Sequence, residues 1–436
     1  MPSRWTRSNL RVGFLLVGSL LAVILLQRIY ATVGQSAGRK AHISAQSGLE
    51  QSAKAYTAGS LAAHVRAYSE VLDGTEVLLL NTTKPKAVLL VFHGCSHSAT
   101  DWWFGSDTCQ TCSGLPEEVA ITLKALNRHW AVLAFSSSDR TRYRCWDSNF
   151  PPENSVDTLQ VIRTFHTVAT REGWPQDLPR YALGGSSGGA FLLHLALRLE
   201  LTALCSQLMA VRSASLESPP HALGASEQGW TYPPAAFVHM ARDKHTVAAV
   251  EQNMAVLKKQ GVKTMQIIVQ PTPLTPTFMA ERVDGITLEQ SKAVFEALRE
   301  GDALDESGWL RADPRTTGAA SYVSMLHIDP RRQQAAANGQ AAVADALPAS
   351  APSCTDGQQA KGIKCWVSRL HMAYTSWRSL VRSRLPEANV AADESAIAEE
   401  LNVAWASHEL VRDPMDEVFD WMEAQRVPVK HGKPLT

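Results

Sequence analysis

The sequence predicts an α/β fold, a mostly parallel sheet with helices on both faces. First, apolar β-branched runs alternate with helical segments between residues 86 and 260, as strands joined by crossover helices do. Second, the run KAVLLVF at residues 86–92 shows no polar alternation, which is typical of a strand buried on both faces. Third, a chain of 436 residues is long enough to bury a full core.

The composition excludes several classes of protein. The chain is 45% hydrophobic and 19% charged, with 26 Gly and 22 Pro, values that are ordinary for globular proteins and unlike disordered, collagenous or coiled-coil chains. Because 42 Lys and Arg balance 42 Asp and Glu, no overall electric field attracts nucleic acid. We therefore expect no nucleic-acid partner.

The N-terminus is predicted to direct the chain to a membrane. Residues 12–26 (VGFLLVGSLLAVILL) are uncharged and apolar, and three arginines precede them, which is typical of a secretory signal. No clean cleavage site follows, so we interpret residues 1–31 as a signal anchor, with a cleaved signal peptide as the alternative. Residues 32–59 would be a linker, and the body would be lumenal or extracellular, either membrane-anchored or secreted.

The elements of the predicted core follow one another along the chain. Residues 69–80 are predicted to form two strands that turn at Asp73-Gly74, a strong hairpin signal. Further strands are predicted at residues 86–92, 130–135, 181–183 and 235–240, and helices at residues 116–127, 155–172 and 246–260. A helix is also expected after residue 190, where apolar residues recur at helical spacing up to Leu199. Ligands of such sheets bind beyond the carboxyl ends of the strands.

Four of the seven cysteines are predicted to form local disulfides. Cys109 and Cys112 form a C-x-x-C motif in a loop, and Cys354 and Cys365 bracket a polar stretch, a usage that fits an oxidising compartment. Zinc is the competing interpretation of a C-x-x-C motif. A zinc site needs four ligands, and the sequence holds no second C-x-x-C or H-x3-H motif, so we expect no metal.

The other three cysteines allow one more bridge. Cys95 and Cys145 can form it, which leaves Cys205 unpaired. Because Cys205 lies in an apolar, helical-looking stretch, we expect it to be a buried free thiol.

The strongest motif follows a predicted strand. Residues 181–190 read YALGGSSGGA, which fits the Gly-x-Ser-x-Gly turn that presents a nucleophilic serine between a strand and a helix. Gly184 and Gly188 would let the backbones pass closely at this turn. The motif also fits with Ser187 at its centre, but we favour Ser186, which lies three residues past the last apolar strand residue. The alternative is a Gly/Ser-rich loop without chemistry.

A nucleophilic serine of this kind needs backbone N–H groups that stabilise the oxyanion. The loop after the buried strand begins His93-Gly94-Cys95, and we predict that the N–H groups of Cys95 and Ser187 face each other across the site. Gly94 would let the loop come close. His93 and His97 precede the serine, against the order Ser, acid, His, so we interpret them as loop-shaping residues.

The acid and the base are expected later in the chain. Asp243 follows the strand predicted at residues 235–240, where an acid would orient a histidine, and the alternative is a surface aspartate in a turn. His408 has the best surroundings for the base, because it lies just before the Asp413-Pro414 start of a closing helix. His327 is the chief rival, because the 165 residues between Asp243 and His408 are a long separation.

That separation is explained by an insertion. Residues 271–392 contain the helical stretch ITLEQSKAVFEALREG and an Ala/Gln-rich run, and we interpret them as a cap or lid over the active-site face. Residues 60–270 would form the core, and residues 393–436 its C-terminal part. The alternative to a lid is an accessory helical lobe.

These motifs resemble those of the α/β-hydrolase superfamily, and within it the esterase branch of poly(3-hydroxybutyrate) depolymerases and feruloyl or acetylxylan esterases. The resemblance lies in four stretches: FHGCSHSATDWW (92–103), RCWDSNF (144–150), YALGGSSGGA (181–190) and HMARDK (239–244). It implies an α/β-hydrolase fold, Ser186 as nucleophile, an oxyanion loop at Cys95 and Ser96, and a Cys95–Cys145 bridge. The insertion, the C-x-x-C motif and the N-terminal segment depart from the bacterial depolymerases and suggest a membrane-anchored eukaryotic branch.

Together these features predict a serine hydrolase that acts on small or polymeric carboxylic esters. Ser186 would attack the ester carbonyl, His408 would be the general base and Asp243 would orient it, with no cofactor. The alternatives are a serine peptidase or amidase with the same triad, and an inactive hydrolase fold used as a binding module. Three tryptophans near the site would line a pocket or belong to the core: Trp102, Trp103 and Trp146.

Overall fold

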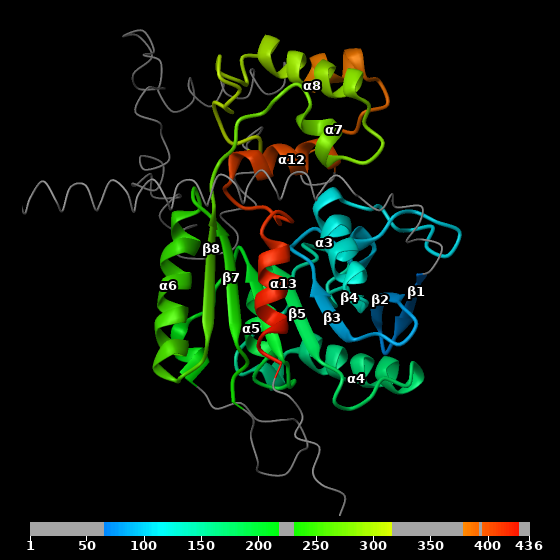
Figure 1. Cartoon of the computed structure of the whole chain (residues 1–436), viewed down its shortest axis with the longest axis vertical. Helices are drawn as coiled ribbons and strands as arrows, with labels where there is room; N and C mark the ends of the chain where they lie inside the picture. The colour runs from blue at the N-terminus through cyan, green and yellow to red at the C-terminus, as the bar shows by residue number, and fades with distance from the viewer. Residues whose placement is uncertain (1–64, 218–230, 316–377, 392–394, 427–436) are drawn as a thin grey trace, which may run out of the picture. The chain divides into compact units, whose positions relative to one another are not determined.

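The computed structural model (Figure 1) describes four stretches of the chain: residues 65–217, 231–315, 378–391 and 395–426. Several predicted features lie outside the described residues: the signal segment 1–31, the linker 32–59, Cys354, Cys365 and the rival base His327. Among the residues that are described, no helix has both the length and the apolar character needed to cross a membrane.

The described residues contain an eight-stranded sheet in the order β1-β2-β4-β3-β5-β6-β7-β8. β1 and β2 form the predicted antiparallel hairpin, β2 is also antiparallel to β4, and the other neighbouring strands are parallel. The strands are β1 (Arg66–Leu72), β2 (Thr75–Asn81), β3 (Ala87–Phe92), β4 (Trp130–Phe135), β5 (Arg180–Gly185), β6 (Ala203–Gln207), β7 (Ala235–Met240) and β8 (Thr264–Val269). This strand order is that of an α/β-hydrolase fold, so the predicted fold class is confirmed.

Helices cover both faces of the sheet (Figure 1). On one face, α4, α5 and α6 bury their apolar side chains in a cluster with Phe92 and Leu204 of the strands. On the other, Phe419 of α13 contacts Trp130 of β4, with 4.9 Å between the ring centroids. The helices are α3 (Pro116–Asn127), α4 (Val156–Arg171), α5 (Ser187–Leu195), α6 (Lys244–Lys259) and α13 (Met415–Glu423), with short 3-10 helices η1 (Ala99–Trp102), η2 (Pro152–Asn154) and η3 (Ser213–Glu217).

The helices begin at local signals in the sequence. α3 begins at Pro116, whose missing N–H needs no partner in a first turn. α4 begins where the Ser155 Oγ accepts the Thr158 N–H at 3.3 Å. These starts match the helices predicted at residues 116–127 and 155–172.

Two strands, β6 and β8, are absent from the sequence-based prediction, which places Cys205 in a helical stretch. That placement is wrong, because α5 ends at Leu195 and Cys205 lies in β6. Leu197, Leu199 and Leu201 continue the apolar pattern between α5 and β6, so periodicity alone does not separate a helix from a short buried strand here, and pairing with β5 and β7 decides the structure. Cys205 is nevertheless a buried free thiol, as expected.

The region predicted as an insertion has an apolar core of its own. Its described helices are α7 (Phe278–Arg282) and α8 (Leu288–Glu300), with further helical residues at 378–384. Their buried side chains form a second cluster together with α12 (Ala396–Trp405), and Figure 1 shows α7, α8 and α12 grouped together. α12 lies C-terminal to the predicted boundary at residue 392, so its packing ties the C-terminal segment to the insertion.

Candidate active site

Ser186 occupies the sharp turn between β5 and α5. Its φ of 51° and ψ of −118° are rarely adopted by a residue with a side chain, and the Ser186 N–H donates to the Gln207 carbonyl at 2.9 Å. A Cβ added at Gly184 would lie 2.3 Å from the Gly188 oxygen, and one at Gly188 would lie 2.3 Å from the Phe92 oxygen. Both predicted glycines therefore allow backbone approaches that no other residue permits.

The structure brings Ser186, His408 and Asp243 together. His408 Nε2 lies 2.8 Å from the Ser186 Oγ, and His408 Nδ1 lies 2.9 Å from an Asp243 carboxylate oxygen. With Nδ1–H donating to Asp243, Nε2 is the acceptor for the serine hydroxyl. The three residues come from the ends of β5 and β7 and from the loop before α13, as the sequence predicts.

Asp243 is held as a carboxylate. It accepts the Thr246 backbone N–H at 3.0 Å and the Thr246 hydroxyl at 2.6 Å, and so it also caps α6. Burial tends to raise the pKa of the Asp243 carboxyl, but the hydrogen bond and charge of His408 and the bonds from Thr246 outweigh burial and lower the pKa to about 2. An ionised acid beside Nδ1–H is the arrangement that stabilises an imidazolium.

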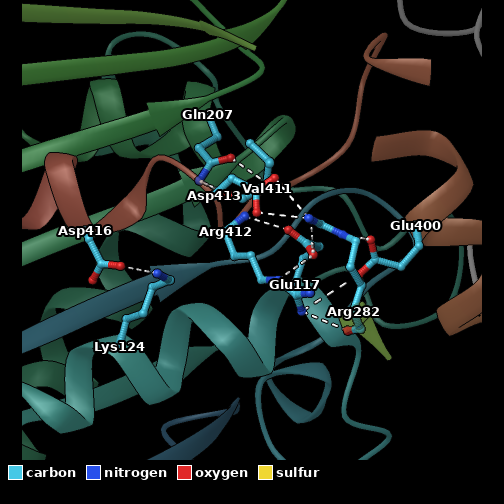
Figure 2. A network of polar contacts seen from close by, with 9 residues as sticks. All are labelled: Glu117, Lys124, Gln207, Arg282, Glu400, Val411, Arg412, Asp413 and Asp416. Atoms are coloured by element: carbon cyan, nitrogen blue, oxygen red, sulfur yellow. Dashed lines mark hydrogen bonds and ion pairs between the residues drawn. The ribbon is translucent and has the colours of Figure 1, made fainter. Parts of the chain in front are cut away.

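The loop that carries His408 runs from the end of α12 to the start of α13. The Gln207 side chain pairs with Val411 in both directions, donating to its carbonyl at 3.1 Å and accepting its N–H at 3.0 Å (Figure 2). Next to Gln207, a Cβ at Gly185 would lie 2.7 Å from Leu410 Cδ2, so the loop packs directly against the turn that carries Ser186. Gln207 thus bonds to Ser186 through its backbone and to the His408 loop through its side chain.

An ion-pair network holds the far end of the same loop. Glu117 of α3 accepts the Arg412 backbone N–H at 2.5 Å and an Arg282 N–H at 3.0 Å (Figure 2). Arg282 of α7 also pairs with Glu400 of α12 and donates to the Asp413 carboxylate at 3.0 and 3.1 Å. Glu117 and Glu400 are fully buried, and Arg282 and Arg412 both pair with them and supply positive charge beside these acids.

The loop after β3 lies beside the turn that carries Ser186. The Cys95–Cys145 disulfide and a 2.8 Å hydrogen bond from the Ser96 N–H to the Tyr143 carbonyl hold it against residues 143–146. A Cβ at Gly94 would lie 3.6 Å from the Ser186 Cβ, an ordinary van der Waals distance, so this loop passes beside Ser186 but has room for a side chain at residue 94.

The two N–H groups predicted to hold an oxyanion belong to Cys95 and to Ser187, the first residue of α5. Within the described residues, neither N–H donates a hydrogen bond to another group.

The histidines of this loop do not contact the serine hydroxyl. His93 is buried, accepts the Ser137 N–H at Nε2 and donates from Nδ1 to the Gly94 carbonyl, and burial lowers the pKa of His93 to about 3. His97 bonds to Asp101 at 3.2 Å. Burial tends to lower the pKa of His97, but Asp101 and the charge of the buried Glu118 raise this pKa to about 9.

The remaining predicted residues are also placed. Trp102, Trp103 and Trp146 are buried, and Trp146 stacks on Phe191 at 4.5 Å between ring centroids, so they belong to the core rather than to an open pocket. The Cys109–Cys112 disulfide is present as predicted. In the described residues, no group of three or more His, Cys, Asp or Glu side chains is arranged to hold a metal ion.

No known protein family and no curated protein matches this chain in sequence. Among solved structures, TT1662 from Thermus thermophilus is 18% identical, with 47% of this chain and 89% of that chain covered and a TM-score of 0.31. A carboxylesterase from Mesorhizobium loti is 15% identical, covering 46% of this chain and 89% of its own at a TM-score of 0.31. An esterase from an Arctic intertidal metagenomic library is 11% identical, covering 47% and 84% at a TM-score of 0.32.

Proposed function

We propose that this chain is a serine hydrolase that cleaves carboxylic esters, with Ser186 as nucleophile, His408 as general base and Asp243 as the acid that orients His408. The observation that carries the proposal is the continuous hydrogen-bond chain from the Ser186 hydroxyl through both nitrogens of His408 to Asp243. The strained backbone of Ser186 supports it as well, because strain of this kind persists where function requires it.

The reaction follows from these contacts. His408 Nε2 takes the Ser186 proton as the oxygen attacks the ester carbonyl, and the N–H groups of Cys95 and Ser187 stabilise the oxyanion. The tetrahedral intermediate collapses to an acyl-serine, and His408 returns its proton to the departing alcohol. Water, deprotonated by His408, then attacks the acyl-serine, and His408 returns that proton to the Ser186 oxygen as the acid leaves, which restores Ser186.

The proposed substrates are small or polymeric esters. The resemblance of residues 92–103 and 144–150 to poly(3-hydroxybutyrate) depolymerases and feruloyl or acetylxylan esterases suggests polymeric 3-hydroxyacyl esters and acylated polysaccharides for the first panel. The same triad can also cleave amides, so a panel of p-nitrophenyl esters should be read beside p-nitroanilides of the same acyl groups. Faster cleavage of the anilides would favour a peptidase or amidase.

The first test is labelling with a fluorophosphonate, which reports an activated serine without assuming a substrate. We expect the oxidised full chain to form one adduct that peptide mapping places on Ser186, and Ser186→Ala to form none. Ser206→Ala is a matched control, because that serine is the next-to-last residue of the neighbouring strand β6 and its hydroxyl donates to the Met209 carbonyl. Absence of any adduct on the folded, oxidised chain would contradict the proposal and favour an inactive binding module.

We also propose that residues 12–26 attach the enzyme to a membrane and that its body lies in an oxidising compartment, or is secreted. The two disulfides of the core support the second point, because such bridges persist in oxidising compartments. Alkaline carbonate should leave the full chain in the membrane fraction, and detergent should release it. Release by carbonate alone would favour the secreted form.

A further inference from the structure

The backbone carbonyl of His408 is held by the insertion. Arg315 lies within residues 271–392, and its Nη1 donates to the His408 carbonyl at 2.8 Å. This is a direct hydrogen bond between the inserted region and the residue proposed as the base.

Asp313 holds the Arg315 side chain in place beside His408. Its Nε and Nη2 donate to the two carboxylate oxygens of Asp313 at 3.2 and 3.0 Å, and its backbone N–H donates to Asp313 at 2.9 Å. A guanidinium bound through two parallel bonds to one carboxylate is a rigid planar unit, which leaves Nη1 aimed at a third acceptor. The side chain is only 8% exposed, so water competes little for the bond to His408.

The insertion reaches the same loop at a second place. Arg282 of α7 donates to Asp413, five residues after His408, and the Arg412 side chain donates to the Arg282 carbonyl at 2.9 Å (Figure 2). From the core side, Gln207 holds Val411 between these two points. The loop is therefore bonded to the core in its middle and to the insertion on either side.

The imidazole of His408 must meet two partners at once, Ser186 at Nε2 and Asp243 at Nδ1. Its ring can do so only if its own backbone is fixed, because a displacement of about 1 Å in a catalytic group can lower the rate about 100-fold. We infer that Arg315 is a positioning residue for His408, so that the insertion forms part of the machinery of the base and is more than a cover. This inference rests on the proposed function.

The test compares turnover per active site in the full chain. Fluorophosphonate titration counts the competent sites, and p-nitrophenyl butyrate gives kcat and KM. For Arg315→Met we expect kcat per titrated site to fall about 10- to 100-fold with KM within about twofold, because the change moves a reacting group and leaves substrate binding alone. Arg315→Lys keeps one charged donor and should recover part of the loss, and Asp313→Asn, which keeps Arg315 but weakens its support, should show a smaller fall.

Arg311→Met is the matched control. Arg311 lies four residues away and bonds to the Leu304 carbonyl at 3.1 Å and to Asp302 at 3.2 Å, and in the described part of the chain no side-chain hydrogen bond or ion pair joins it to the His408 loop. We expect its kcat per site to equal that of the wild type.

Three outcomes would overturn the inference. They are wild-type kcat per site in Arg315→Met and Asp313→Asn, a loss only in the number of titratable sites, and an equal loss in Arg311→Met. If Arg315→Met does not fold, Arg315→Lys and Asp313→Asn decide the matter by the same measure. A wild-type chain that takes no label would show instead that the proposed function is wrong, and the inference would fail with it.

Discussion

Gln207 offers a substitution whose effect should depend on pH. Its side chain is fully buried and makes two hydrogen bonds to Val411, one donated to its carbonyl and one accepted from its N–H, while Nε2 also donates to the Met415 Sδ at 3.1 Å. A protonated glutamate at this position offers the same pair, an O–H donor and a C=O acceptor. An ionised glutamate keeps only the acceptor and faces the Val411 carbonyl with a negative charge.

The magnitude follows from the number of groups left unpaired. Gln207→Leu strands a buried donor and a buried acceptor, each at a cost of about 1–3 kcal/mol, so the free energy of unfolding should fall by roughly 2–6 kcal/mol. In Gln207→Glu, burial raises the pKa of the new carboxyl above its usual value of about 4.3. The folded state then holds a proton that the unfolded state has lost, and stability relative to the wild type falls as pH rises through this interval.

The assay is the ratio of variant to wild-type kcat/KM on one ester between pH 5.5 and 9, with urea unfolding at both ends. For Gln207→Glu the ratio should lie near one at the acid end and fall toward the value for Gln207→Leu at the alkaline end. Gln260→Glu is the control, because that exposed amide makes a single 2.8 Å bond to the Leu216 carbonyl. A ratio for Gln207→Glu that does not change with pH, or a stable and fully active Gln207→Leu, would refute the reasoning.

Three further substitutions test other parts of the site. Asp243→Asn should lower kcat about 10⁴-fold with the fold retained, and an Asn variant with near-normal turnover would exclude the triad. Because the pKa of Asp243 is about 2, protonation of this carboxylate should not lower the wild-type rate above pH 4. Gly188→Ala should lower the free energy of unfolding by about 2 kcal/mol or more and abolish fluorophosphonate labelling, because the new Cβ would lie 2.3 Å from the Phe92 oxygen. Full labelling at wild-type stability would contradict this. Burial raises the pKa of Glu118 from 4.5 to about 7. The free energy of unfolding of Glu118→Gln, measured in urea, should therefore exceed that of the wild type by up to about 3 kcal/mol above pH 7 and equal it below about pH 4.5. Equal pH dependence of unfolding in the two proteins would contradict this.

Local signals predict the elements that carry the proposed nucleophile and the proposed acid. The glycines at 184 and 188 are required by backbone atoms within a few residues of one turn or at the end of the adjacent strand, and a Gly/Ser-rich turn between a strand and a helix announces such crowding. The Asp413-Pro414 pair marks the start of the last helix and so places His408 on the loop before that helix, which favours His408 over His327. These features were predictable because short-range sterics and capping determine them.

The residues that support the base were not predictable in this way. Gln207 and Val411 are 204 residues apart, and Arg315 and His408 are 93 apart, so no spacing or periodicity connects either pair. β6 was missed for the same kind of reason, because its partners β5 and β7 and not its own five residues make it a strand. A buried glutamine or arginine in a single sequence looks like any surface residue until its partner is known.

The 165 residues between Asp243 and His408, which make His327 the chief rival for the base, add little to the free-energy cost of closing the loop between them. Closing a loop costs about 0.6 kcal/mol more for each doubling of its length, so even a fourfold increase in the separation of Asp243 and His408 adds only about 1.2 kcal/mol. One buried pairing such as that of Gln207 with Val411 offsets this amount. The inserted residues also build their own apolar cluster, joined by α12, so much of the added length is ordered by contacts of its own rather than by the site. An insertion between Asp243 and His408 is therefore compatible with a fixed base, provided that the residues on either side of His408 are bonded, as Gln207, Arg282 and Arg315 bond them.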